Sequence, residues 1–107
     1  MAPPEALLDR ISTLLARPEG RDDPAQLERT LTDGYAHALS LEAEKSRLQK
    51  QLGKATAAAG RGDAGSRDEL RRLAERLEAQ DGSLVQLRGQ LARLRQRHSR
   101  VARSLRG

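Results

Sequence analysis

The C-terminal part of the chain carries an apolar repeat that holds one phase from Leu70 to Leu105. Its members advance by alternating steps of three and four, which places them on one narrow stripe of an α-helix. The members are Leu70, Leu73, Leu77, Leu84, Leu87, Leu91, Leu94, Val101 and Leu105, with Gln80 and His98 as polar positions. The repeat predicts a helix over 67–105 that buries this stripe against another helix.

A second stripe with the same spacing precedes it and predicts a helix over 24–59. Its members are Leu27, Leu31, Gly34, Ala38, Leu41, Lys45, Leu48 and Leu52. The start is marked by Asp23, whose carboxylate can accept a free backbone N–H, and by Pro24, which suits the first helical position. Gln26 can reach back to complete a capping box.

Between the two stripes lies a turn over 60–66 that contains Gly60, Gly62 and Gly65. Glycines end helices and let the chain reverse, and Ser66 with Glu69 predicts a capping box for the next helix. A reversal there pairs residues whose numbers sum to about 125. The predicted pairs are Leu52 with Leu73, Leu48 with Leu77, Leu41 with Leu84, Ala38 with Leu87, and Gly34 with Leu91.

The same register brings Lys45 opposite Gln80, the polar residue of each stripe. A slip of one heptad would place both polar residues against leucines, so this pair is expected to fix the register. The fold class is therefore an all-α antiparallel coiled-coil helical hairpin.

One alternative concerns the continuity of the last helix. Asp81, Gly82 and Ser83 could interrupt it, with Ser83 and Gln86 forming a new capping box. The unbroken phase of the repeat favours a single helix, although glycine weakens a helix interior.

The turn also contains the tripeptide Arg61-Gly62-Asp63, which resembles an adhesion signal. Glycine and aspartate are common in turns, and the chain is rich in arginine. We therefore interpret the tripeptide as turn chemistry.

A short N-terminal helix is predicted over 4–17, with Pro4 in its first turn and Pro18 with Gly20 after its end. Its apolar face consists of Leu7, Leu8, Ile11, Leu14 and Leu15. A helix this short needs a partner surface, so we expect it to dock antiparallel to the second helix at the open end of the hairpin. This docking is expected to cover Tyr35 and Leu39.

Composition limits both the core and the chemistry. The 107 residues include one aromatic, Tyr35, and no cysteine, so a single helical domain with a narrow core is expected. His37 and His98 supply the only imidazoles of the sequence, and Asp33 with His37 gives too few ligands for a metal. We therefore predict no catalytic residue, no cofactor and no metal.

The first twenty residues lack an uninterrupted apolar run because Asp9 and Arg10 divide it. We therefore expect neither a signal peptide nor integral membrane association, and predict a cytoplasmic protein.

The chain has a net charge of +5, and from Gly82 onward it holds seven arginines and no acidic residue. The candidate contacts for an anion or nucleic acid are Arg93, Arg95, Arg97, Arg100, Arg103 and Arg106. Such positive density suits phosphate contacts, but no aromatic is present nearby to stack on bases. A solvated cationic helix end is the simpler interpretation.

These observations predict a non-enzymatic interaction or scaffold protein that self-associates, most readily as a homodimer forming a helical bundle. The alternative is a nucleic-acid-associated protein that makes nonspecific phosphate contacts through its arginine-rich end. The sequence does not indicate a particular protein partner.

Overall fold

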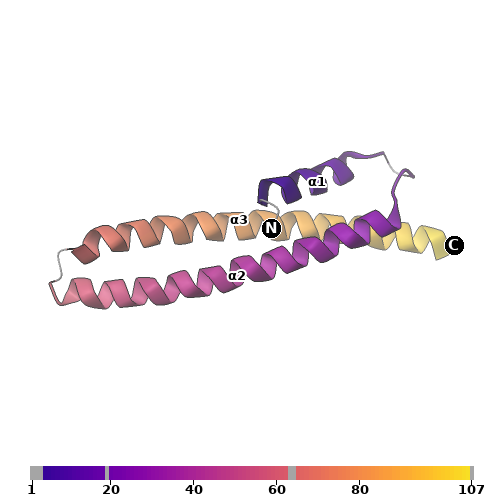
Figure 1. Cartoon of the computed structure of the whole chain (residues 1–107). Coiled ribbons are helices and arrows are strands. Elements are labelled where there is room, and N and C mark those ends of the chain that lie inside the picture. The colour runs from indigo at the N-terminus through magenta and orange to yellow at the C-terminus, as the bar shows by residue number, and fades with distance from the viewer. Residues whose placement is uncertain (1–3, 19, 63–64, 107) are drawn as a thin grey trace. The chain divides into compact units, whose positions relative to one another are not determined.

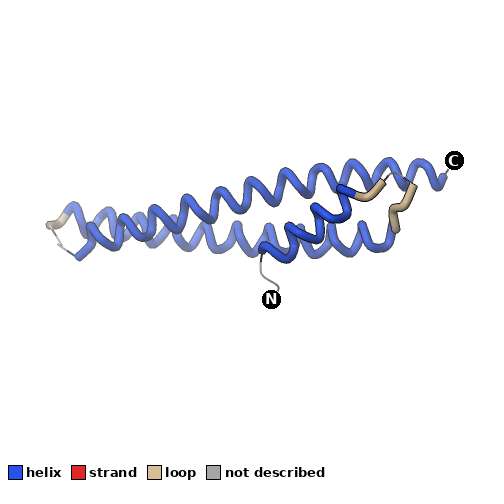
Figure 2. The backbone as a smooth tube through the Cα atoms, turned by 90° about the horizontal axis from the view of Figure 1, so that it is seen from above, coloured by secondary structure: helices blue, strands red, loops and turns tan. Residues whose placement is uncertain are grey.

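The computed structural model describes residues 4–18, 20–62 and 65–106, with the side chains of residues 4 and 106 outside that description. Over these ranges every regular element is a helix, and short loops connect them (Figure 2). The all-α prediction is therefore confirmed.

Three helices account for this structure and are labelled in Figure 1: α1 (Pro4–Ala16), α2 (Pro24–Gly60) and α3 (Gly65–Arg106). Each observed boundary lies within two residues of its predicted position. Helix α3 continues through Gly82, so the alternative of a break at that glycine is wrong.

The chain divides into two compact units, which are described in turn. The three-helix unit comprises Met1–Leu39 and Val85–Gly107, and therefore holds α1, the first part of α2 and the last part of α3. The two-helix unit comprises Ser40–Leu84 and holds the remaining parts of α2 and α3.

The core of the three-helix unit draws apolar side chains from all three helices. Ile11, Leu27 and Leu94, one from each helix, are fully buried. The other buried members are Leu7, Leu14, Leu31, Ala38, Leu87 and Leu91. Burying one such leucine stabilises a fold by roughly 1.5–3 kcal/mol, so this core offsets the cost of ordering the short helix α1.

Helix α1 lies antiparallel to α2, as the sequence predicts. Arg10 donates from both terminal nitrogens to Asp33 Oδ2 at 3.2 Å, and it also reaches Thr30 Oγ1 at 3.3 Å. Near the other end of α1, Arg17 Nη1 donates to Gln26 Oε1 at 2.8 Å. These contacts place α1 on one flank of α2.

The predicted covering of Tyr35 and Leu39 by α1 is wrong, because these side chains remain 43% and 66% exposed. The partners of α1 on α2 include Thr30 and Asp33. At 100° per residue, Tyr35 and Leu39 fall on the opposite flank of the leucine stripe. A helix docked on one flank cannot reach the other.

The start of α2 is fixed by Asp23, whose Oδ1 accepts the backbone N–H of Ala25 at 3.1 Å. This bond satisfies one of the free donors of the first turn, so the predicted cap is present. Gln26 does not return a bond in a capping box. Its side-chain oxygen instead accepts from Arg17, which links the two ends of the first loop.

Within the three-helix unit, α2 and α3 approach closely at Gly34. A Cβ built on Gly34 would lie 2.3 Å from Leu91 Cδ2, so any larger residue here would force the Leu91 side chain to shift. The pair agrees with the predicted register, and it shows a small residue of one stripe accepting a large residue of the other.

The two-helix unit has a smaller core. Leu48, Ala55 and Leu73 are buried together, and Leu52, Leu70 and Leu77 pack against them while remaining partly exposed. Leu41 and Leu84 are also buried in this unit. Two helices can cover only the stripe between them, so the leucines at its edges keep contact with water.

The polar residue of the α2 stripe forms an ion pair that the stripe pattern does not include. Lys45 Nζ bonds Asp81 Oδ1 at 2.7 Å. Asp81 is adjacent to Gln80, the residue expected opposite Lys45, so this contact agrees with the predicted register to within one residue. A lysine side chain is long enough to leave the stripe and pair with the nearest carboxylate, which keeps its charge solvated.

The end of α2 shows the expected glycine chemistry. The backbone N–H groups of Arg61 and Gly62 donate to the carbonyls of Ala58 and Ala59, each at 3.1 Å, and Gly62 has a φ of 85°. Such left-handed backbone favours glycine. Asp63 lies outside the described residues, so the tripeptide is not described as a whole.

Helix α3 begins at Gly65, which places Ser66 inside the first turn. Its side chain is buried, with 5% of the residue exposed. Ser66 therefore does not occupy the predicted cap position.

Candidate functional site

Neither catalytic nor metal chemistry gains support from the described side chains. Over residues 4–18, 20–62 and 65–106, no group of three or more His, Cys, Asp or Glu residues gathers to hold a metal. Asp33, which shares a helix face with His37, is engaged by Arg10. The Nε2 atom of His37 and the Oε1 atom of Gln90 are buried without a hydrogen-bond partner.

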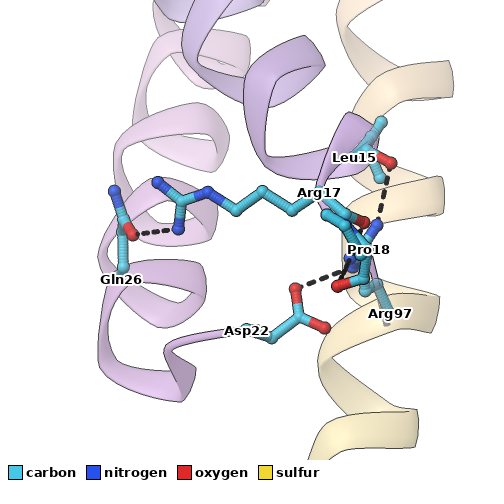
Figure 3. A network of polar contacts seen from close by, with 6 residues as sticks. All are labelled: Leu15, Arg17, Pro18, Asp22, Gln26 and Arg97. Atoms are coloured by element: carbon cyan, nitrogen blue, oxygen red, sulfur yellow. Dashed lines mark hydrogen bonds and ion pairs between the residues drawn. The ribbon is translucent and has the colours of Figure 1, made fainter. Parts of the chain in front are cut away.

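The most structured polar site is built around Arg97 of α3 (Figure 3). Its Nε donates to Asp22 Oδ1 and its Nη1 donates to the carbonyl of Leu15, both at 2.8 Å. Its Nη2 bonds the carbonyls of Arg17 and Pro18. Only 8% of Arg97 is exposed, so every guanidinium nitrogen has a partner inside the protein.

These bonds satisfy carbonyl groups at the C-terminal end of α1. The last carbonyls of a helix have no partner within the helix, and a buried unpaired carbonyl costs about 1–3 kcal/mol. α1 ends at Ala16, and Arg97 supplies donors to the carbonyls around this end. The positive guanidinium also lies at the negative end of the helix dipole.

Asp22 compensates the charge of Arg97. Its side chain is 5% exposed and that of Arg97 is 9% exposed, so the pair is shielded from water. A buried charge is tolerated when it is paired and its hydrogen-bonding groups are satisfied. Here one oxygen of Asp22 and several carbonyls together satisfy a single guanidinium.

The loop between α1 and α2 positions Asp22 and the carbonyls of Arg17 and Pro18 beside Arg97. Gly20 has a φ of 91°, a backbone conformation that glycine adopts without strain. The two consecutive aspartates then have separate roles, since Asp22 pairs with Arg97 and Asp23 caps α2. The loop therefore holds α1, α2 and α3 of the three-helix unit together.

The predicted anion contacts divide into two groups in the structure. Arg93, Arg95, Arg100 and Arg103 are exposed, while Arg97 is occupied internally. The side chain of Arg106 lies outside the described residues. The number of positive charges in this part of the sequence could not distinguish the buried Arg97 from the exposed arginines around it. Its distinguishing signal is its place beside the leucine stripe, on the flank that faces α1.

A hollow of about 340 Å³ lies beside the Arg97 network. It is lined by Gly20, Asp22, Pro24, Arg97, Arg100, Val101, Ser104 and Leu105. The lining combines apolar side chains with a carboxylate already paired to Arg97.

His98 has a more polar environment than its place in the stripe predicts. Its Nε2 lies 3.3 Å from Glu28 Oε1, and a quarter of its side chain is exposed. The predicted register, with numbers that sum to about 125, sets His98 opposite Leu27, an apolar residue of the α2 stripe. The ring instead turns to the carboxylate one residue further along α2.

A second candidate site is an exposed apolar surface of the three-helix unit. Tyr35, Leu39 and Val85 are 43%, 66% and 64% exposed, and we call this set the Tyr35 flank. On α2 it lies opposite the side that holds α1. Single exposed apolar residues are ordinary, whereas Tyr35 and Leu39 lie one helical turn apart on the same flank of α2, which makes this surface a candidate site.

Comparison with protein-family models, curated proteins and solved structures finds no match to this chain. In the described part of the chain, the helices are too polar or too short to span a lipid bilayer. We therefore infer its function from its own residues.

The Arg97 network yields a prediction with a matched control. Replacing Arg97 with Met keeps the apolar stem but leaves Asp22 and the carbonyls of α1 unpaired. Removing one partner of a buried ion pair costs about 3–5 kcal/mol, so unfolding in urea, followed by circular dichroism, should begin at lower denaturant. Arg95→Met, an exposed neighbour, should change the free energy of unfolding by less than about 0.5 kcal/mol. Equal effects of the two substitutions would show that the network is not stabilising.

Proposed function

We propose that the protein is a non-enzymatic helical interaction module that self-associates, in the simplest case as a dimer. The observation that carries this proposal is the exposure of Tyr35, Leu39 and Val85. Covering such side chains on association removes apolar surface from water, which drives most protein–protein contacts. The remaining surface of the helices is strongly charged, which suits a protein that stays dissolved until it meets a partner.

The two-helix unit supports the same proposal. Leu52, Leu70 and Leu77 are only partly buried because α2 and α3 cover one stripe and leave both flanks open. Pairing two antiparallel coiled-coil hairpins into a four-helix bundle would shield these edges. Helical bundles of this kind bring partners together through shape and apolar area and need no cofactor.

Self-association is tested by the mass in solution over a range of concentrations. Light scattering coupled to size-exclusion chromatography should give a mass near twice the 11.8 kDa of one chain at high concentration. Dilution should lower that mass, because association follows mass action. A constant mass of one chain at every concentration would contradict the proposed function.

A second function draws on the arginine-rich end of α3. Arg93, Arg95, Arg100 and Arg103 are exposed, and no acidic residue follows Asp81. Exposed arginines can neutralise phosphates of DNA or RNA and release bound counterions. Contacts of this kind would be independent of base sequence, because the phosphates are the same at every nucleotide.

The test of this second function changes Arg93, Arg95, Arg100 and Arg103 to Gln and leaves the buried Arg97 in place. Binding to duplex DNA should weaken with salt, and the slope of log affinity against log salt should fall by about 0.9 for each lost contact.

The matched control has the same change in charge in the two-helix unit, at four exposed positions: Arg67, Arg71, Arg72 and Arg76. It should retain the wild-type salt slope if the end of α3 makes the contacts. Equal losses in both variants would indicate an effect of net charge alone, and no binding at low salt would exclude this function.

A further inference from the structure

We propose that a second copy of the chain packs on the Tyr35 flank, with α2 of each copy facing α3 of the other. This inference rests on the proposed self-association and identifies the surface that performs it. The two copies would be related by a two-fold axis that runs parallel to the helices.

The flank is available because α1 is fixed elsewhere. Arg10 and Arg17 bind α1 to Asp33 and Gln26, which lie on one side of the leucine stripe of α2. Tyr35 and Leu39 project from the opposite side. On α3, Arg97 faces α1, and Val85 lies well away from it around the helix. The packing of the three-helix unit therefore leaves this surface to a partner.

The exposed side chains of α2 and α3 lie at matching heights along the helix axes, and we call this height the level of a residue. The matching levels make the surface self-complementary. Gly34 lies against Leu91, so residues of α2 and α3 at one level have numbers that sum to about 125. Leu39 and Val85 therefore lie within about one residue of the same level, a rise of about 1.5 Å. A rotation about an axis parallel to the helices preserves level and exchanges α2 with α3. Leu39 of one copy then meets Val85 of the second copy, and the contact occurs twice.

Charge on the same flank favours a copy of this chain over an unrelated partner. Glu28 on α2 and Arg95 on α3 are both exposed and lie at nearby levels. The same rotation brings Glu28 of one copy toward Arg95 of the second copy, again twice. Each copy therefore carries the complement of both its apolar and its charged groups, which is the requirement of a two-fold interface.

The arrangement can be tested by disulfide formation because the chain has no cysteine of its own. Leu39→Cys and Val85→Cys are made as separate full-length proteins, mixed and oxidised gently. The expected product is a mixed disulfide dimer, because the two positions would lie within bonding distance. Each variant oxidised alone should give at least several-fold less dimer. Ser40→Cys mixed with Val85→Cys is the control, since Ser40 is exposed at the same level of α2 and projects about 100° around the helix from Leu39.

A pure Leu39→Cys protein that cross-links as well as the mixture would place α2 against α2 and overturn the arrangement. Oxidation can trap rare encounters as disulfides. A second measurement is therefore the dissociation constant for self-association of the Leu39→Glu variant. This substitution should weaken association at least tenfold with unchanged helical circular dichroism, while Ser40→Glu should leave the dissociation constant unchanged.

The two proposals fail in different ways. If the wild-type chain is monomeric, both the self-association and this interface are excluded. If it is dimeric but Leu39→Glu remains dimeric and the mixture does not cross-link, only this interface is excluded, and the copies associate through another surface.

Discussion

The close contact between Leu91 and Gly34 is the constraint on which the three-helix unit depends. Leucine stripes alone could slide by one heptad and still bury apolar area, but only one register sets this leucine over a glycine. Once that level is fixed, Leu27, Leu31 and Leu94 are buried, and the flanks of α2 and α3 face defined directions. The positions of both the Arg97 network and the Tyr35 flank follow from it.

Arg97 contributes a charge and no apolar area to the core. It nevertheless helps to determine which side chains form the core of the three-helix unit. By bonding carbonyls at the end of α1 and pairing with Asp22, it fixes the C-terminal end of this thirteen-residue helix to α3. α1 then covers one flank of the α2–α3 pair in this unit and leaves the other open. The location of the polar network thus determines which apolar side chains of this unit remain exposed.

The sequence was sufficient for the parts of the fold that depend on periodicity and local caps. The stripes predicted α2 and α3 and the level of Gly34, and Asp23 predicted the start of α2. Sequence reasoning failed where several side chains compete for one partner in space. The ion pair between Lys45 and Asp81 is not part of the stripe pattern, and Arg97 resembled the exposed arginines around it. Leu39 is exposed because α1 docks on the other flank of α2. The apolar face of α1 does not indicate which flank α1 will occupy.

The most direct test of the register is the effect of Gly34→Ala measured with and without Leu91. In the wild-type chain the added methyl collides with Leu91, and overpacking of about 1–3 kcal/mol should outweigh the gain of about 1 kcal/mol in helix propensity. In a Leu91→Ala background the methyl has room, so the same substitution should raise the free energy of unfolding. This reversal of sign is the predicted result. An equal effect of Gly34→Ala in both backgrounds would show that the two residues do not touch and would contradict the register.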